Sequence, residues 1–452
     1  MRALSVVDLL FLLFENSKQP MHVSGLCTFE VPVGDEHFVS RLMSEINTEI
    51  LPNFPFNQVL YRQIFWQVSE DFQLHHHCQY HKLTTGSNDE LMTLISRIHE
   101  RPLERSRPLW SIHIIDHLAP ESDGAPKRFA LFLKIHHALA DGVAAMRLFQ
   151  RSLAQTAYEK NMLPVWAMKL KKSTAPPPPD QPWAKHISEQ IKSLAPACRE
   201  LLVNFSQKKQ QNRHLISSFD APKSILNQRI GTARHLGIRA FDKARFVTIA
   251  KRFNVSTNDA LMAVCGHALR TYLLGQNALP EQSLVAFVPV SLRDNDSSVG
   301  NRISFTPTLL GTEHDDAIMR LHDIHHSMKL GKERFERLSW SAVINYTALS
   351  YGWAGLNLAT RAYPTKQAFN LIISNVPGDD MPLFLNGAKL TGIYPASVLF
   401  DGQALNISFC NYQNRIDFGI TACQTALPNI EILLDLIEDA LQVYEKLATD
   451  QA

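Results

Sequence analysis

The 452-residue chain lacks several features that would point to particular functions. Its formal net charge is only +2, which argues against a dedicated nucleic-acid-binding protein. It contains no glycine-rich loop of the Walker or dinucleotide-binding type, so a phosphorylated ligand would have to be held by scattered lysines and arginines. None of its six cysteines forms a C-x-x-C pair and most lie in apolar runs, which predicts buried, reduced thiols in a cytosolic protein.

Long hydrophobic runs are also missing. Asp8 interrupts the apolar N-terminal stretch, and the unbroken run Leu9–Phe14 is too short for a secretory core or a membrane span. No other stretch reaches membrane length. We therefore expect a protein that is soluble, or at most attached to a lipid surface.

What the chain does contain is enough apolar sequence, 45% of its residues, for a sizeable core, and a length that suggests two lobes. Strand-like and helix-like patterns alternate in both halves, which predicts an α/β architecture. Between the halves lies a basic and then proline-rich stretch, followed by an amphipathic pattern at 184–210. We expect an N-terminal lobe at 1–168, a linker with a bridging helix at 169–215, and a C-terminal lobe at 216–452.

The stretch KIHHALADG (134–142) holds the residues most suited to catalysis. An apolar strand pattern ends at His136 and His137, and a helical pattern begins at Gly142. Because side chains alternate along a strand, the two imidazoles point in different directions: one into a cavity ahead, the other bracing the loop. A histidine suits proton abstraction because its pKa lies near working pH. Asp141 is placed to cap the helix or to bind an arginine.

Two other interpretations of this stretch remain open. Both histidines can be core or surface residues beside a helix cap. His136, His137 and Asp141 also supply metal-ligand types, although adjacent strand residues diverge and no fourth ligand is near in sequence. A second histidine cluster, LHHHCQYH (74–81), is interpreted as a polar strand face with solvent-facing imidazoles.

The motif His136–His137–x3–Asp141–Gly142 resembles the HHxxxDG motif of the CoA-dependent acyltransferase superfamily, which peptide-synthetase condensation domains share. The surrounding blocks resemble those of the bacterial bifunctional wax ester synthase/diacylglycerol acyltransferases. These blocks are LSVVDLLFLLFENSKQPMHV (4–23), RPLERSRPLW (101–110), STNDALMAVCGHALR (256–270), VPVSLR (288–293), GNRIS (300–304), ISNVPG (373–378), YPAS (394–397) and DGQALNIS (401–408). Ser24 and Asp379 depart from the usual family residues. The resemblance implies a two-lobed, chloramphenicol acetyltransferase-like α/β fold with a tunnel between the lobes.

The resemblance also implies a reaction. His137 would act as general base on an alcohol whose oxygen attacks an acyl-CoA thioester, with acyl-CoA as co-substrate and no bound cofactor or metal. Asn258 would support the base, whereas Asp259 also fits a simple helix-capping role with Ser256. Asp141 would organise the loop, with Arg293 as a candidate partner. The expected substrate-tunnel residues are Trp110, Asp259, Arg293, Gly352, Gly355, Ser374 and Asn375.

The leading hypothesis is an enzyme that makes triacylglycerol or wax esters, with acyl-CoA, diacylglycerol and long-chain alcohols as partners and no nucleic acid. The alternatives are a condensation-type acyltransferase, a reading of His136-x4-Asp141 as the HX4D pattern of glycerolipid-phosphate acyltransferases, and a non-catalytic lipid-droplet protein. We expect a cytoplasmic protein peripheral to a lipid inclusion or inner membrane, because KLKK (169–172) adjoins an amphipathic pattern.

Overall fold

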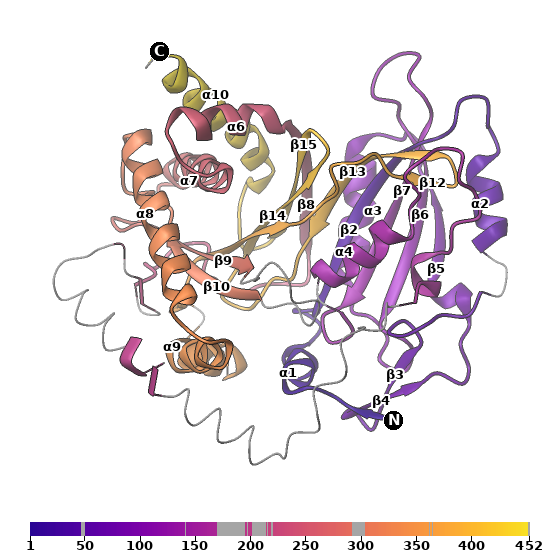
Figure 1. The fold of residues 1–452 in the computed structure, drawn as a ribbon, viewed down its shortest axis with the longest axis horizontal. Coiled ribbons are helices and arrows are strands. Elements are labelled where there is room, and N and C mark those ends of the chain that lie inside the picture. Colours follow the sequence, from indigo (N-terminus) through magenta and orange to yellow (C-terminus); the bar gives the residue numbers. More distant parts are fainter. Residues whose placement is uncertain are drawn as a thin grey trace.

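The chain folds into two α/β lobes, each built on a six-stranded mixed sheet (Figure 1). This description rests on a computed structural model that describes residues 1–46, 50–140, 142–169, 195–196, 198–200, 214, 216–217, 220–291, 303–360, 362–363 and 365–450. The α/β class and the two-lobed arrangement expected from the sequence are confirmed. Most of the predicted linker and bridging helix lies outside the described residues.

The first lobe contains the sheet in which the histidine pair lies. Its strand order is β12 (Phe384–Leu385), β13 (Ala388–Ala396), β2 (His22–Glu30), β7 (Arg128–His136), β6 (Trp110–Leu118) and β5 (Cys78–Lys82). The helices of this lobe are α1 (Val6–Phe14), α2 (Phe38–Ile46), α3 (Asn88–Glu100) and α4 (Gly142–Arg151). A small sheet of β1 (Arg2–Ala3), β4 (Phe65–Val68) and β3 (Gln58–Tyr61), and the short helical turns η1 (Leu74–His76) and η2 (Val165–Ala167), complete it.

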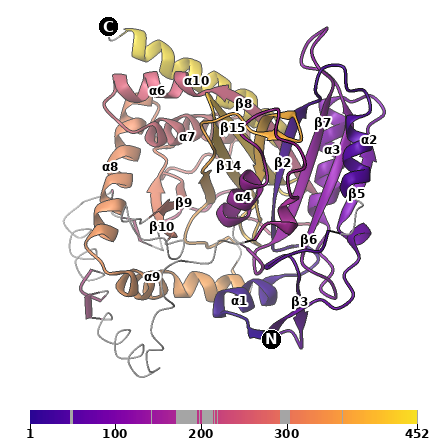
Figure 2. The same ribbon diagram turned by 45° about the vertical axis from the view of Figure 1, so that its right-hand side comes forward.

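The second lobe places its sheet against a layer of long helices (Figure 2). Its strand order is β10 (Ile303–Leu309), β9 (Val285–Ser291), β11 (Leu371–Val376), β14 (Leu405–Tyr412), β15 (Arg415–Cys423) and β8 (Arg234–Asp242). The helices are α6 (Lys243–Arg252), α7 (Thr257–Gly275), α8 (Ala317–Glu336), α9 (Trp340–Thr360) and α10 (Leu433–Asp450), with η3 (Ile430–Ile432) before the last.

The two sheets do not divide at one point of the chain. β12 and β13 come from the second half of the sequence, yet β13 pairs antiparallel with β2 in the first lobe. β13 also lies directly against β15: a Cβ added at Gly419 would fall 1.8 Å from the carbonyl oxygen of Pro395. Asp417 of β15 accepts a hydrogen bond from the backbone N–H of Ile393 at 2.7 Å. The two lobes are therefore connected by β13, a strand from the second half of the sequence that belongs to the sheet of the first lobe.

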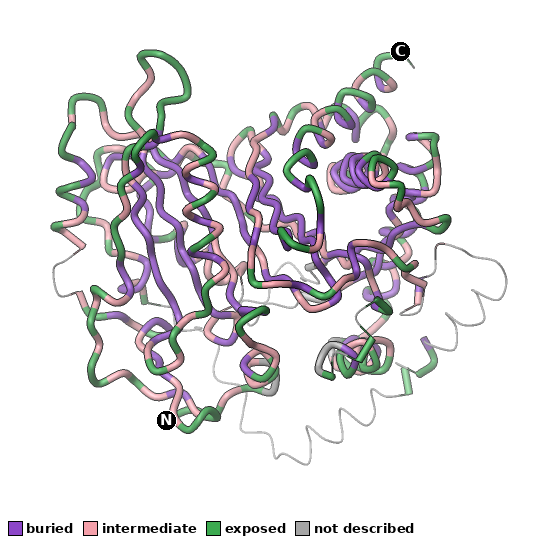
Figure 3. The backbone as a smooth tube through the Cα atoms, turned by 180° about the vertical axis from the view of Figure 1, so that it is seen from behind, coloured by how far each residue is buried: buried purple, intermediate pink, exposed green. Residues whose placement is uncertain are grey.

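Burial follows the sheets. The central strands of both lobes are buried along most of their length, whereas loops and the outward faces of the helices carry the exposed residues (Figure 3). Every residue of β7 from Phe129 to His136 is buried, because helices or the neighbouring lobe cover both faces of this sheet. The apolar alternation in the sequence is therefore not an inside–outside pattern, and the strand ends in the interior of the molecule.

One local expectation was wrong. The stretch 74–81 does not form a strand with solvent-facing imidazoles throughout, because Leu74–His76 form a short helical turn and the strand begins only at Cys78. His77 is buried; its ring stacks on Trp110 with centroids 4.5 Å apart, and its Nδ1 lies 2.8 Å from the Trp110 carbonyl oxygen. His77 is buried because its ring packs on the Trp110 indole, although its histidine-rich neighbourhood favours an exposed position.

Candidate active site

The histidine pair lies where β7 ends and a short turn leads into α4. β7 ends at His136, residues 137–139 form the turn, and α4 begins at Gly142, as the sequence pattern predicts. His136 is fully buried and His137 is half-buried. The expected divergence of the two imidazoles is therefore present in the structure.

Both ring nitrogens of His136 face protein groups. Its Nδ1 accepts a hydrogen bond from the backbone N–H of Ala138 at 3.0 Å, so the proton of the neutral ring resides on Nε2. That Nε2 lies 3.3 Å from Oε1 of Glu15, whose side chain is only 4% exposed. With no exposed surface and both nitrogens directed at protein groups, His136 braces the turn and is not available to a substrate.

His137 is held differently. Its ring stacks on Phe11 of α1 with centroids 4.6 Å apart and an interplanar angle of 9°. Its backbone N–H donates to the carbonyl oxygen of Met21 at 2.8 Å. One face of the imidazole is thus fixed by an aromatic ring and the backbone is anchored, while the residue stays partly accessible. His137 is therefore fixed in orientation without being fully enclosed, in contrast to His136.

Glu15, at the C-terminal end of α1, was missed by the sequence analysis. Oε1 accepts the backbone N–H of Met21 at 3.1 Å, and Oε2 accepts Nε of Arg105 at 3.1 Å. Burial alone raises the pKa of Glu15, but the hydrogen bonds from His136, Met21 and Arg105 outweigh it, so the pKa lies below its ordinary value. The available signal was a single acidic residue closing an apolar helix just before the strand that pairs with β7.

The wall behind the histidines contains buried groups that resist protonation. Lys134 donates from Nζ to the carbonyl oxygens of Ile98, at 2.7 Å, and Arg101, and burial lowers its pKa to about 7. Burial also lowers the pKa of His99 and of His113 to about 3. The interior of this lobe therefore disfavours positive charge.

Asn258 and Asp259 stand in the first turn of α7. Asn258 is half-buried. Asp259 forms the predicted capping box: its backbone N–H donates to Ser256 Oγ at 3.1 Å, and its Oδ2 accepts from the Ser256 backbone N–H at 3.0 Å. The same Oδ2 lies 2.9 Å from Nδ1 of His325 on α8. These contacts give Asp259 a structural role in joining two helices.

The remaining predicted residues occupy three places. Trp110 is buried at the start of β6, and its Nε1 donates to the Phe56 carbonyl oxygen at 2.8 Å, so it is a fixed wall residue. Ser374 and Asn375 are half-buried on β11, where Asn375 Oδ1 accepts from Asn411 Nδ2 at 3.0 Å. Asp141 and Arg293 lie outside the described residues.

Gly352 and Gly355 lie on α9 and are exposed. A Cβ added at either position would have no heavy atom of the described chain within 4 Å, leaving out the helix's own backbone nearby. Close packing against another helix therefore does not explain these glycines. Their surroundings have room for an additional group.

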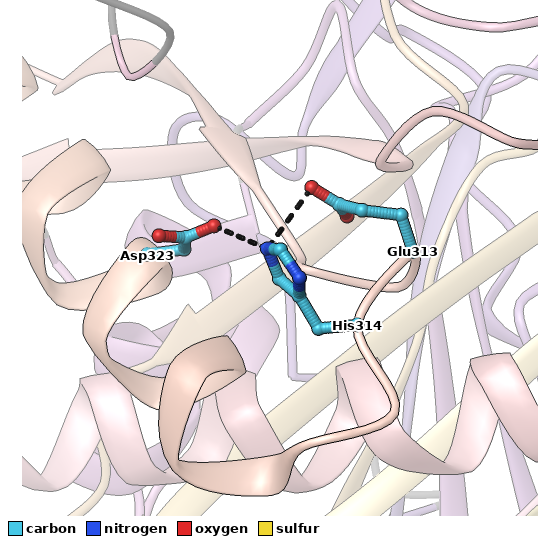
Figure 4. Close-up of side chains that lie close together, drawn as sticks. All are labelled: Glu313, His314 and Asp323. Carbon is cyan, nitrogen blue, oxygen red and sulfur yellow. Dashed lines mark hydrogen bonds and ion pairs between the residues drawn. The ribbon is translucent and has the colours of Figure 1, made fainter.

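Within the described ranges, one group of side chains has the proximity of metal ligands, and it lies in the second lobe. His314 Nε2 is 2.8 Å from Asp323 Oδ2 and 3.3 Å from Glu313 Oε1 (Figure 4). The imidazole nitrogen faces one oxygen of each carboxylate and is hydrogen-bonded to Asp323. We assign no metal to them.

Family models match most of the chain. The wax ester synthase/diacylglycerol acyltransferase catalytic domain matches residues 4–261, and the WS/DGAT C-terminal domain matches residues 299–445. The chain is 41% identical to "O-acyltransferase WSD" of Acinetobacter baylyi, covering 100% of this chain and 98% of the relative. It is 34% identical to the Mycobacterium tuberculosis protein named "Probable diacyglycerol O-acyltransferase tgs2", covering 97% and 98%.

Solved structures agree with this. A wax ester synthase/diacylglycerol acyltransferase from Marinobacter aquaeolei VT8 superimposes with a TM-score of 0.80 at 34% identity, over 99% of this chain and 100% of that one. The starter condensation domain of rhizomide synthetase RzmA, solved with C8-CoA, matches with a TM-score of 0.57 at 14% identity, over 99% and 95%. The second likeness shows a shared fold alone.

Proposed function

The chain belongs to the wax ester synthase/diacylglycerol acyltransferase family, and from this membership and the geometry of the histidine turn we propose that His137 is the general base of its reaction. The protein is an O-acyltransferase that moves an acyl group from acyl-CoA to the hydroxyl of diacylglycerol or of a long-chain alcohol. The products are triacylglycerol and wax ester. Acyl-CoA is a co-substrate, consumed in each turnover.

In the proposed mechanism, neutral His137 removes the proton from the acceptor hydroxyl as its oxygen attacks the thioester carbonyl. A C–O bond forms and the carbonyl oxygen becomes an oxyanion. When the tetrahedral intermediate collapses, the C–S bond breaks and the protonated imidazole returns the proton to the departing thiolate. Ester and free CoA leave, and no covalent enzyme intermediate is needed. A hydroxyl or backbone N–H would stabilise the oxyanion.

The observation that carries this assignment is the contrast between the two imidazoles. His136 is fully buried and directs its ring nitrogens at Ala138 and Glu15, whereas His137 is half-buried and braced by Phe11. The HX4D reading needs the first histidine to act on substrate, which its contacts oppose. We propose Asn258 as a supporting group, and a loop-organising role for Asp141 with Arg293 follows from the family motif.

The test is an assay of free thiol release with palmitoyl-CoA against hexadecanol and against diacylglycerol. We expect His137→Ala to abolish turnover with both acceptors while His136→Ala keeps measurable turnover. The reverse result would favour the HX4D reading. Turnover unaffected by loss of both histidines would contradict a catalytic role for the motif.

We also propose that the protein lies on a lipid surface, with α1 and α9 facing the lipid. No helix among the described residues has both the length and the apolar character to cross a membrane. The two helices lie next to each other along one side of the molecule in both ribbon views (Figures 1 and 2). Their exposed apolar side chains are Leu10, Leu13, Ile344, Leu349, Trp353 and Leu356. Exposed apolar residues on these two helices, one of which also carries Phe11 against His137, support docking onto the source of an apolar substrate.

Flotation with vesicles of anionic lipid containing diacylglycerol tests the surface. We expect binding of the wild-type protein and reduced binding of Leu13→Asp and Leu356→Asp. Val33→Asp is the matched control, because Val33 is exposed but lies in the loop between β2 and α2. Equal binding of all variants would show that this side does not contact lipid.

A further inference from the structure

The segment Glu15–Met21 joins the catalytic turn to the second lobe. Toward the second lobe, the carbonyl oxygen of Lys18 accepts from Nη2 of Arg234 at 2.5 Å, and Oε1 of Gln19 accepts from the backbone N–H of Asp401 at 2.6 Å. Toward the turn, the carbonyl oxygen of Met21 holds the backbone N–H of His137. This short segment therefore connects the histidine turn to two residues of the second lobe.

Glu15 organises this segment from within. One carboxylate oxygen takes the backbone N–H of Met21 and faces His136 Nε2, while the other takes the guanidinium of Arg105 at 3.1 and 3.0 Å. Nη2 of Arg105 also donates to the Leu12 carbonyl oxygen at 2.6 Å, which ties the same arginine to α1.

Three connections run from Glu15 to His137. The first passes through His136, the preceding residue. The second passes through Met21, whose N–H binds Glu15 and whose carbonyl oxygen binds His137. The third passes through Phe11, whose carbonyl oxygen accepts the backbone N–H of Glu15 and whose ring stacks on His137. The backbone of His137 and the residue before it thus depend on the buried carboxylate of Glu15, whereas the ring that stacks on His137 is tied to the backbone of Glu15.

We propose that Glu15 is a positioning residue for the acyl transfer: through His136 and Met21 its carboxylate holds the imidazole of His137 in place against the acceptor hydroxyl. The proposal rests on the proposed role of His137 as general base. Glu15 does not touch substrate and moves no proton. Its ionised form is required because every group facing it is a donor, and a neutral amide would bring an NH2 group against N–H groups. Small misplacements of reacting groups cost up to about 10²-fold in rate.

The decisive variant is Glu15→Gln, which preserves shape and removes charge. We expect kcat for palmitoyl-CoA with hexadecanol to fall about 10- to 100-fold while KM for both substrates changes less than about threefold. Glu15→Asp should recover part of the loss. Glu104→Gln is the matched control, because this exposed carboxylate next to Arg105 pairs, among the residues that the structure describes, with Arg107 and the neighbouring Ser106 hydroxyl. Its kcat should equal that of the wild type.

A double variant separates positioning from general damage. If Glu15 acts partly through His136, the loss in Glu15→Gln/His136→Ala should be smaller than the product of the two single losses. Arg105→Lys serves as a second probe if Glu15→Gln does not fold, since it keeps the charge and loses the two-nitrogen contact; it should lower kcat with KM unchanged. A folded Glu15→Gln enzyme with wild-type kcat, fully multiplicative losses, or an effect on KM alone would overturn the proposal. If His137→Ala is inactive in any of these cases, only the role of Glu15 is refuted and the role of His137 as general base stands. If His137→Ala is active, the proposed role of His137 is itself refuted.

Discussion

Replacing each of the two adjacent histidines with alanine should separate stability from catalysis. His136→Ala empties a fully buried site, removes the acceptor of the Ala138 N–H and takes one donor from Glu15. The cavity costs about 2–3 kcal/mol and the stranded polar groups about 1–2 kcal/mol, so the free energy of unfolding should fall by about 4 kcal/mol. His137→Ala removes a half-buried ring and its stack on Phe11, worth about 1 kcal/mol.

If one lobe unfolds as a unit of about 200 residues, these values correspond to decreases in Tm of about 10 °C and about 3 °C. Differential scanning calorimetry on both variants gives the stability, and thiol release at a temperature where both are folded gives the turnover. We expect His136→Ala to be the less stable of the two variants and also the more active one. A His137→Ala protein less stable than His136→Ala, or a His136→Ala protein as stable as the wild type, would refute the assignment of roles.

Three further predictions concern other parts of the molecule. Gly355→Ala should raise the free energy of unfolding by about 1 kcal/mol, because α9 gains helix propensity and nothing in the described chain obstructs the methyl group. Calorimetry checks this value. A changed preference for acyl or alcohol chain length in the same variant would place α9 along the path of the lipid substrate. Asp259→Ala should lose about 2 kcal/mol of stability from the cap and the His325 bond while folded enzyme retains its kcat; a large drop in kcat without destabilisation would show instead that Asp259 serves the reaction. Burial lowers the pKa of His113 from 6.5 to about 3, so between these pH values the unfolded chain binds a proton that the folded chain does not, and the wild type loses stability as pH falls from 6.5 toward 3. In denaturant titrations of His113→Gln, the free energy of unfolding should change with pH less steeply than in the wild type, by about 1.4 kcal/mol per pH unit. An unchanged pH dependence would count against neutral burial of this ring.

The elements around the histidines were predictable because they depend on local sequence. The apolar run before His136 predicts a strand, Gly142 predicts the start of a helix, and Ser256 with Asp259 predicts a capping box, and all three are present. The likeness of the whole chain to one family supplied the two-lobed fold.

What could not be predicted depends on contacts between distant segments. Nothing in the local pattern of 388–396 says that this strand leaves its own half of the chain to pair with β2. Glu15 was overlooked because its partners Arg105 and His136 are 90 and 121 positions away in sequence. His77 was misjudged because a histidine-rich surface pattern does not reveal a distant indole that buries one of its members.

The pairing of β13 with β2 has a consequence for producing the two halves of the chain as separate fragments. A first half made alone would present the unpaired edge of β2 to solvent, where it would recruit other chains. If the chain is divided between residues 169 and 220 and both halves are produced together, β13 of the second half can pair with the open edge of β2 in the first half. Such a pair would behave as a split enzyme whose activity reports the meeting of its fragments.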